Sequence, residues 1–596
     1  MKLSVFFISG IAKLQKHAAT HFRIWLLVSM LLLLAFAEYL PEGIRLVLQG
    51  TDSLQSIFRN MVSLIWMSFP FYLAICAPVT LLPPRGIRIY LAILLPVVSG
   101  ITLLHIFLLS CFRIALGRGL LYVLFDTGKE EVAEYLGEHL QPSPILIFLL
   151  FTAIAAAITV SALRLNWKQE KRSFFLCILL LGPLLVSATR FIVIGEPTAI
   201  LYRVSSLRII ADFLALISEQ DRFYQAAAIA PQLPEDIRPV APGLSNLLGI
   251  IAIGESATRS HHGLYGYSRD TTPFQSGRSD LMVFNRVFSA APLTGVSLKY
   301  ALTFATLHKP DEYRCTLVSI LKKAGIRTVW LSAQGERCST DSLLFHGADR
   351  VLYSPADTCD DALAEMLPQA LAGWERSPVV ILFHLNGSHS DYSRRYPKQQ
   401  QQQRFTDLPP EPAHLSAEEI ESINHYDNSI VFTDSILKKL IGFLETTERP
   451  SFLLYFSDHG EAPARNGRNN IRNPKVTAPI FYEVPFWAWA SRQYHAIRPG
   501  FAENARGNRD KPMQLDRGGI YALCDIAGIR YRNFPEEANI FSASFRSQPI
   551  YFLGTVFSAS SIPAEDVKLP VVFSSPPDYI IPRRNTDGTM AHAPRR

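Results

Sequence analysis

The first third of the chain is dominated by long apolar runs that few charged residues interrupt. Five such runs lie near residues 23–43, 57–82, 88–112, 143–164 and 173–195. Each is long enough to cross a bilayer, which takes roughly 20 residues as a helix. Buried helices of a large soluble core are the alternative, but five runs this close together argue against it. The pattern predicts a transmembrane domain of five helices over residues 1–195.

Two segments beside the predicted spans have an amphipathic pattern. Residues 126–136 read DTGKEEVAEYL and predict a short helix on the outer face of the membrane. Residues 205–217 predict a second amphipathic helix, which lies either on the membrane surface or packed on the protein surface. The proline-rich stretch 231–242 reads as a linker. Residues 196–245 are therefore expected to join the membrane domain to a soluble one.

From Leu247 onward, short apolar runs alternate with helix-like segments. The runs read LLGIIAIG, RTVWLSA, VVILFHL, FLLYFSD and VPFWAWA, and the longest helix-like segment spans 418–446. This alternation predicts an α/β domain with a largely parallel central sheet over residues 246–560. The proline-rich residues 561–596 predict an irregular tail.

Positive charges beside the apolar runs predict the orientation of the membrane domain. One side carries ten of them: Lys2, Lys13, Lys16, Arg23, Arg85, Arg88, Arg164, Lys168, Lys171 and Arg172. The opposite side carries six: Arg45, Arg59, Arg113, Arg118, Lys129 and Arg190. Because cytoplasmic loops carry the excess of Lys and Arg, we expect a cytoplasmic N-terminus. Five spans then place the α/β domain outside the cytoplasm.

Composition narrows the class of protein further. The net charge of +7 is small for 596 residues, and no basic stripe suggests nucleic-acid binding. No small-residue cleavage site follows the first run, so we interpret it as an anchor. Four cysteines fall in the exported part, where disulfides can persist: Cys315, Cys338, Cys359 and Cys524. Cys338 and Cys359 are close enough in sequence to pair, but the sequence does not fix the pairing.

Residues that bind metals follow three of the apolar runs. Glu255 follows the first, His384 and His389 lie at and after another, and Asp458-His459 follows a third. In parallel sheets, ligands bind at the carboxyl ends of the strands. Glu, Asp and His are oxygen and nitrogen donors that suit zinc. Each residue has an ordinary alternative, such as a helix N-terminal charge, a turn or a core histidine. Their coincidence at three strand ends favours a metal site.

A nucleophile is expected at Thr294, where a loop enters a predicted helix. The free N–H groups of a helix start would favour a phosphate on its oxygen, and a nearby zinc would activate the hydroxyl. The alternative is a plain N-cap threonine. Other hydroxyls lie close in the sequence and compete for the role: Ser256, Thr258, Ser297 and Thr303.

Several long motifs resemble those of the membrane-bound phosphoethanolamine transferases of the alkaline phosphatase/sulfatase superfamily, especially the branch that modifies the lipopolysaccharide core. The motifs are LFDTGKEEVAEYL at 124–136, IGESATRSHHGLYGYSRDTTP at 253–273, VFNRVFSAAPLTGVSLKYALTFA at 283–305, HLNGSHSDYSRRYP at 384–397, YDNSIVFTD at 426–434 and YFSDHGE at 455–461. The resemblance implies a five-helix membrane domain and a sulfatase-like catalytic domain.

The resemblance also implies roles for individual residues. Glu255, Thr294, Asp458 and His459 match the zinc-site positions, with Thr294 as the residue that becomes modified. His389 matches a histidine that assists at the phosphate or a second metal. Glu131 matches a residue that meets the head group of the lipid donor, and His384 is assigned to substrate beside His389.

The sequence departs from the family pattern at three places. Relatives carry further histidines soon after the Asp-His-Gly-Glu motif, whereas this chain has none between His459 and His495. Glu483 stands near a frequent His-Val-Pro, and Gly128 replaces a frequent asparagine in the outer helix. One zinc ion is therefore expected, and a second is left open.

The implied function is transfer of phosphoethanolamine from phosphatidylethanolamine to lipopolysaccharide, either at a core sugar or at lipid A, through a phosphothreonine-type intermediate. The enzyme would be a monomer in the bacterial inner membrane, with its catalytic domain in the periplasm. Two alternatives remain. One is a glycerophosphate transferase of the lipoteichoic-acid-synthase type, which uses phosphatidylglycerol. The other is a non-catalytic membrane scaffold of the same fold.

Overall fold

A computed structural model describes residues 26–31, 74–107, 142–165, 181 and 232–557, the last range with gaps at 311, 335–342, 356–357, 398–403, 408–414, 464–478, 548 and 553–554. The chain divides into two compact units, one around the apolar helices of the first third and one around a sheet. The predicted outer helix at 126–136, the amphipathic helix at 205–217 and the tail at 561–596 lie outside the described residues.

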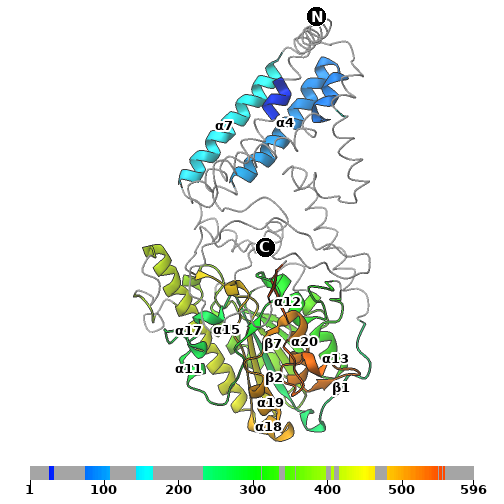
Figure 1. The fold of residues 1–596 in the computed structure, drawn as a ribbon, viewed down its shortest axis with the longest axis vertical. Helices are drawn as coiled ribbons and strands as arrows, with labels where there is room; N and C mark the ends of the chain where they lie inside the picture. Colours follow the sequence, from blue (N-terminus) through cyan, green and yellow to red (C-terminus); the bar gives the residue numbers. More distant parts are fainter. Residues whose placement is uncertain are drawn as a thin grey trace, which may run out of the picture. The chain divides into compact units, whose positions relative to one another are not determined.

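Two long apolar helices pack together in the first unit (Figure 1). They are α4 (Pro84–Phe107) and α7 (Pro142–Arg164), and the short 3-10 helix η1 (Ala77–Thr80) precedes α4. Within the described part of the chain, α4 is long and apolar enough to cross a membrane, whereas the apolar part of α7 is shorter. The two helices coincide with the third and fourth predicted spans, and the other three spans lie mostly outside the described residues.

The surfaces of α4 follow from the spacing of its side chains. Leu91 and Leu95 are fully buried and lie one helical turn apart, on the face that packs inside the unit. Ile89 and Ile93 are more than 60% exposed on another face. Large apolar side chains exposed along a helix are unfavourable in water but suit contact with lipid. The exposed face therefore agrees with the predicted membrane domain.

A seven-stranded sheet forms the centre of the second unit. In spatial order, its strands are β3 (Met282–Val283), β9 (Phe486–Ala490), β8 (Ser451–Ser457), β2 (Leu248–Gly254), β7 (Val379–His384), β5 (Arg327–Ser332) and β6 (Arg350–Tyr353). The strands from β8 to β6 run parallel, whereas β9 and β3 run antiparallel to their neighbours. The predicted α/β domain with a largely parallel sheet is confirmed.

Helices cover both faces of this sheet because β2 is apolar on both sides. Ile251 and Ile253 face one core, and Ile250 and Ala252 face the other. The first core lies under α12 (Thr294–Leu302), α13 (Leu317–Lys323), α19 (Phe501–Gly507) and α20 (Leu515–Ile526). The second lies under α15 (Asp360–Glu365), α16 (Leu367–Leu371) and α17 (Ala417–Glu445), on the opposite side in Figure 1.

The long helix α17 begins where the sequence provides a cap. Ser416 accepts a hydrogen bond from the backbone N–H of Glu419, and Glu419 accepts one from Ser416 in return. This capping box satisfies N–H groups that the first helical turn leaves open. The helix coincides closely with the predicted segment 418–446. It brings Tyr426 and Asp427 to the segment that follows β2.

The remaining elements are short and connect the main ones. They are α11 (Pro273–Ser276), α18 (Arg492–Ile497), η3 (Pro242–Leu244), η4 (Arg259–His261), η5 (Gly263–Tyr265), η6 (Tyr392–Arg394), η8 (Pro479–Phe481) and η9 (Glu536–Ala538). Three strand pairs stand apart from the main sheet: β1 (Arg238–Pro239) with β11 (Ile529–Arg530), β4 (Val287–Phe288) with β10 (Met513–Gln514), and β12 (Ile550–Phe552) with β13 (Thr555–Phe557).

The strand order places the predicted site residues together. β2 lies between β8 and β7, and Ile253 is in register with both Phe456 and His384. The carboxyl ends of these three strands therefore end side by side. Glu255, the loop after His384, and the loop that begins at Asp458 all emerge at this edge, which we call the catalytic edge.

Candidate active site

Three acidic and imidazole side chains converge at the catalytic edge. Glu255, Asp458 and His459 each offer one ligand atom, and these three atoms lie within 4.8 Å of one another. All three residues are buried. His459 Nε2 lies 3.6 Å from Glu255 Oε1 and 3.3 Å from Asp458 Oδ2. This is the cluster that the sequence predicted as a metal site.

The orientation of the His459 ring prepares Nε2 to bind a metal. Its Nδ1 lies 2.8 Å from the carbonyl oxygen of Gly460. A carbonyl only accepts hydrogen bonds, so Nδ1 carries the proton and Nε2 presents its lone pair. Gly460 is required at the next position, because a Cβ there would lie 2.0 Å from the carbonyl oxygen of Ile480.

Backbone groups hold the Asp458 carboxylate in place. Its Oδ1 accepts hydrogen bonds from the N–H groups of Ser256, at 2.9 Å, and His459, at 2.7 Å. Ser256 has a φ of +54°, a left-handed conformation that is uncommon for serine. This conformation at the end of β2 turns the Ser256 N–H toward Asp458, and strain of this kind clusters at functional sites.

The Glu255 carboxylate accepts hydrogen bonds from three side chains. Oε1 accepts from the Ser256 hydroxyl at 2.6 Å, and Oε2 accepts from Thr294 Oγ1 and Gln334 Nε2, each at 3.0 Å. Gln334 also donates to the carbonyl oxygen of Leu385. Gln334 was not predicted as a site residue, although it closely follows the apolar run of β5 as Glu255 follows β2.

Thr294 is the first residue of α12, and its N-cap is Leu293, which makes no side-chain cap. The plain N-cap alternative is therefore wrong, because the threonine hydroxyl turns to Glu255 instead of capping the helix. Thr294 is only half-buried, so a substrate can approach it. The helix start also adds N–H groups that favour a phosphate.

The competing hydroxyls are fully buried and occupied by other contacts. Ser297 donates to the carbonyl oxygen of Asp458, and Thr303 donates to that of Lys299. Thr258 pairs with Ser260 at 3.2 Å. Ser256 touches Glu255 but is inaccessible. Thr294 is thus the hydroxyl that combines contact with the cluster and exposure.

The donor set fits zinc. Two carboxylates and an imidazole lone pair would repel one another at these distances, and a cation offsets that repulsion. Oxygen and nitrogen donors in a roughly four-coordinate set are typical of zinc, and Thr294 Oγ1 lies beside the cluster as a further donor. Among the described residues, Glu255, Asp458 and His459 form the group of ligand side chains that could hold a metal ion.

The three predicted substrate residues have different positions. Glu131 lies outside the described residues. His389 is buried in the loop after β7, where its Nδ1 lies 3.2 Å from Ser390 Oγ. His384 is fully buried, with Nδ1 3.2 Å from Ser332 Oγ and its ring 5.3 Å from that of Trp330. The substrate roles of all three stay predictions.

Asp360 holds the loop that carries His389. Its carboxylate accepts hydrogen bonds from the N–H groups of Asn386, at 2.9 Å, and Gly387, at 3.0 Å. Gly387 has a φ of +49°, and a Cβ there would lie 2.8 Å from the Glu255 nitrogen. Burial raises the pKa of Asp360 to about 6, against these two hydrogen bonds.

Glu483, which stands near the frequent His-Val-Pro of the family pattern, is held by an ion pair. Its Oε2 accepts a hydrogen bond from Arg259 Nη2 at 2.8 Å, and only 3% of its side chain is exposed. The Arg259 N–H also donates to the Glu483 carbonyl. The interval between His459 and His495, where the resemblance implies further histidines, holds none in this chain.

The cysteines of the second unit form no disulfide in the described residues. Cys315, Cys359 and Cys524 are free thiols, and Cys338 lies outside the described ranges. Burial raises the pKa of Cys315 to about 12, which keeps that thiol protonated and unreactive.

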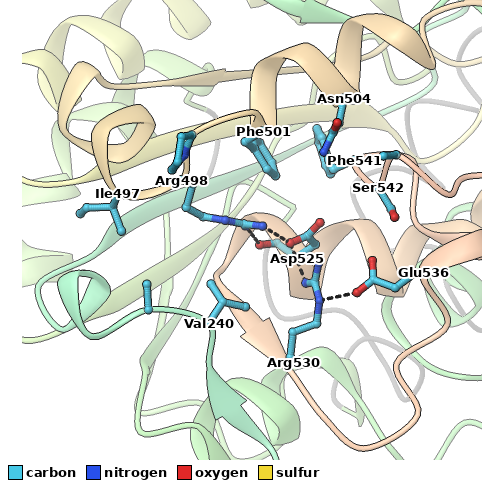
Figure 2. Close-up of a pocket in the computed structure, with 13 residues that line it drawn as sticks. Val240, Ile497, Arg498, Phe501, Asn504, Asp525, Arg530, Glu536, Phe541 and Ser542 are labelled. Carbon is cyan, nitrogen blue, oxygen red and sulfur yellow. Dashed lines mark hydrogen bonds and ion pairs between the residues drawn. The ribbon is translucent and has the colours of Figure 1, made fainter.

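A separate cavity of about 330 Å³ contains an ion-pair network instead of a metal cluster (Figure 2). Arg498 and Arg530 both bond Asp525 Oδ1, each at 2.6 Å, and Arg530 also pairs with Glu536. Burial would raise the pKa of Asp525, but these guanidinium groups lower it below its usual value. The network fastens α18, α20, β11 and η9 together.

Comparison with known proteins defines the class of this domain. Residues 248–512 match the Sulfatase family, so the chain contains a sulfatase-family domain. The chain is 28% identical over 508 residues to the phosphoethanolamine transferase EptC of Escherichia coli (strain K12). The aligned region covers 79% of this chain and 85% of the relative. The predicted likeness to the membrane-bound phosphoethanolamine transferases is confirmed.

Two solved structures agree with this assignment. The C-terminal periplasmic domain of Escherichia coli EptC, in complex with Zn, is 27% identical and has a TM-score of 0.51, covering 56% of this chain and 98% of that domain. The integral membrane protein EptA from Neisseria meningitidis, a lipooligosaccharide phosphoethanolamine transferase, has a TM-score of 0.63 at 18% identity, covering 87% of this chain and 99% of that one. The second likeness shows a common fold that includes a membrane domain.

Proposed function

We propose that this chain is a zinc-dependent phosphoethanolamine transferase that uses Thr294 as its nucleophile. It takes phosphoethanolamine from phosphatidylethanolamine and passes it to lipopolysaccharide, at a core sugar or at lipid A. The observation that carries the proposal is the hydrogen bond of 3.0 Å from the half-buried Thr294 hydroxyl to Glu255, beside Asp458 and His459. The named relatives and the zinc-bound EptC domain support it.

In the first step, Thr294 Oγ1 attacks the phosphorus of the lipid donor. The bond from Oγ1 to phosphorus forms, the bond from phosphorus to diacylglycerol breaks, and diacylglycerol leaves with the threonine proton. The Thr294 hydroxyl points its hydrogen at Glu255 Oε2, so its lone pairs are directed away from the carboxylate. When bound, zinc supplies positive charge that lowers the pKa of a nearby hydroxyl and offsets charge on the phosphoryl oxygens.

In the second step, an acceptor oxygen attacks the phosphorus on Thr294. The bond from phosphorus to Thr294 breaks, and the threonine recovers a proton as the acceptor loses one. Glu255, Asp458 and His459 keep their places throughout, because Gln334, Ser256 and the backbone of Gly460 hold them. Fixed groups of this kind avoid reorganisation during the reaction.

A membrane anchor would hold the enzyme in the bilayer that contains its lipid donor. We propose five spans, a cytoplasmic N-terminus and a periplasmic catalytic domain in the bacterial inner membrane, in a monomeric enzyme. An anchored site meets lipid substrates at high local concentration. One zinc ion is proposed at the cluster of Glu255, Asp458 and His459. Glu131, His384 and His389 are proposed to contact substrate, with His389 at the phosphate.

Mass spectrometry of lipopolysaccharide tests the proposal in cells. Strains with and without the protein should differ by one phosphoethanolamine group, and Thr294→Ala should behave as the strain without it. If lipopolysaccharide from the two strains carries the same amount of phosphoethanolamine, the proposed acceptor is wrong. Purified enzyme given phosphatidylethanolamine or phosphatidylglycerol separates the two donor classes, because a glycerophosphate transferase would use only the second lipid.

A further inference from the structure

Two adjacent histidines follow the Glu255 strand, and their surroundings differ. His262 Nδ1 lies 2.9 Å from the carbonyl oxygen of Thr258, and burial lowers the pKa of His262 to about 4. It is a neutral core residue. His261 Nδ1 instead lies 2.8 Å from Asp427 Oδ1, on helix α17. Nothing in the steps described above uses this histidine–carboxylate pair.

The Asp427 carboxylate is fully buried and fixed by several partners. Its Oδ2 accepts hydrogen bonds from Arg269 Nη1, at 2.8 Å, and the Tyr267 hydroxyl, at 3.0 Å. The Arg269 guanidinium places a positive charge beside this buried carboxylate. An ionised carboxylate only accepts hydrogen bonds, so His261 Nδ1 must carry a proton. This arrangement fixes the ring and leaves Nε2 as the nitrogen that can change its role.

His261 lies close to the backbone that follows Glu255. Its ring meets the Tyr426 ring edge to face, with centroids 5.2 Å apart. The Tyr426 hydroxyl donates to the carbonyl oxygen of Ser256 at 2.7 Å and accepts from the N–H of Thr258 at 2.8 Å. One tyrosine therefore separates the His261 ring from the residue next to Glu255. In the described residues, His261 Nε2 has no hydrogen-bond partner, and 9% of the side chain is exposed.

We propose that His261, oriented by Asp427, binds the acceptor at the catalytic edge through Nε2. The proposal rests on the transferase function and names the residue that receives the second substrate. An acceptor oxygen can meet Nε2 in two forms. Neutral His261 accepts a hydrogen bond from a sugar hydroxyl, whereas protonated His261 donates one to a phosphate. Both acceptor classes thus share one binding group.

The groups that face His261 are Asp427, Arg269, Tyr267 and Tyr426, and its neighbour His262 is neutral. A phosphate-free core oligosaccharide offers hydroxyl oxygens, whereas lipid A also offers phosphate oxygens. The acceptor whose KM rises on loss of Nε2 therefore reports which oxygen His261 meets.

His261→Asn separates binding from structure. The asparagine amide can replace Nδ1 as the donor to Asp427, but it has no group at the position of Nε2. His262→Asn is the matched control, since it keeps the donor to Thr258 in the adjacent core position. Both variants should keep zinc and their melting temperature if the exchanges leave the fold intact.

The experiment uses the full chain in detergent and follows its two half-reactions separately. Phosphatidylethanolamine is added first, and the Thr294 adduct is measured by mass spectrometry. A phosphate-free core oligosaccharide or lipid A is then added, and discharge of the adduct is followed. His261→Asn should form the adduct at the wild-type rate but raise the acceptor KM by about tenfold, the loss expected for one hydrogen bond. His262→Asn should match wild type in both half-reactions.

Discharge of the adduct by His261→Asn at the wild-type acceptor KM would overturn the inference. So would slow adduct formation in that variant with normal discharge, because the residue would then serve the donor. Lack of any adduct in wild type would instead remove the proposed function, and this inference with it. If His261→Asn loses zinc or melts early, His261→Gln replaces it. The glutamine amide can reach the Nε2 position, so an acceptor KM in His261→Gln between the wild-type value and about ten times that value supports the inference. An acceptor KM equal to that of wild type rejects it.

Discussion

Replacing Gly387 with alanine tests how closely the His389 loop supports the metal cluster. Gly387 has a φ of +49°, and an added Cβ would lie 2.8 Å from the Glu255 nitrogen and 2.9 Å from its carbonyl oxygen. Both atoms are backbone and cannot move away alone. Gly387→Ala must therefore displace either the loop or Glu255.

The effects of Gly387→Ala on unfolding free energy and on zinc binding can be separated with a matched control. Gly373 has a φ of +80°, and a Cβ there would meet nothing within 4 Å. Gly373→Ala should therefore cost only the left-handed conformation, about 1–2 kcal/mol of unfolding free energy. Gly387→Ala pays that cost and also shifts Glu255, which should weaken zinc binding by about 10- to 100-fold, as loss of support around a metal ligand does.

Zinc affinity and thermal unfolding are measured for wild type and both variants, with a competing chelator to set the free zinc concentration. Gly373→Ala should unfold at a lower temperature but bind zinc as wild type does. Gly387→Ala should unfold no higher than Gly373→Ala and bind zinc more weakly. Equal zinc affinity in the two variants would refute the reasoning, because it would show that the loop does not hold Glu255 in place.

Three further predictions address other parts of the account. Gln334→Leu removes the amide that donates to Glu255 Oε2. The zinc affinity should therefore fall about 10- to 100-fold, and an unchanged affinity would show that Gln334 does not support the site. Asp360 has its pKa raised to about 6 by burial, above about 4 in an unfolded chain, so the folded state binds more protons between these values. Its contribution to stability is largest below pH 4 and falls as the pH rises through 6. Asp360→Asn should make the melting temperature vary less with pH over that window. An unchanged dependence of the melting temperature on pH would contradict the raised pKa of Asp360. Reporters fused after Asn166 and after Pro242 should read cytoplasmic and extracytoplasmic respectively, and the same side for both would reject five spans.

The convergence of Glu255, Asp458 and His459 could be predicted because parallel strands end at a common edge. Glu255 and Asp458-His459 each follow an apolar run, and β2 and β8 are neighbours in the sheet. The long motifs then singled out Thr294 among several hydroxyls. Its N-cap alternative could be rejected only from backbone geometry, because Leu293 takes the cap position and frees the threonine side chain.

The contacts that support the cluster could not be predicted in the same way. Gln334 reaches Glu255 from 79 residues away, and Asp427 reaches His261 from 166 residues away. Each depends on which strand or helix lies next to β2, and a single sequence carries no signal for such pairs. The Arg259–Glu483 pair is similar, since the sequence marks Glu483 only as a departure from the family pattern.

The central claim is that Thr294 carries phosphoethanolamine during the reaction. Zinc-loaded enzyme is incubated with phosphatidylethanolamine without an acceptor, and the peptide spanning 287–299 is examined by mass spectrometry. The account predicts a phosphoethanolamine increment on Thr294. It also predicts that Thr294→Ala folds and binds zinc but lacks both adduct and transfer, while Thr294→Ser keeps partial activity through its hydroxyl. An adduct on Ser256 or Thr258, or normal turnover by Thr294→Ala, would contradict it.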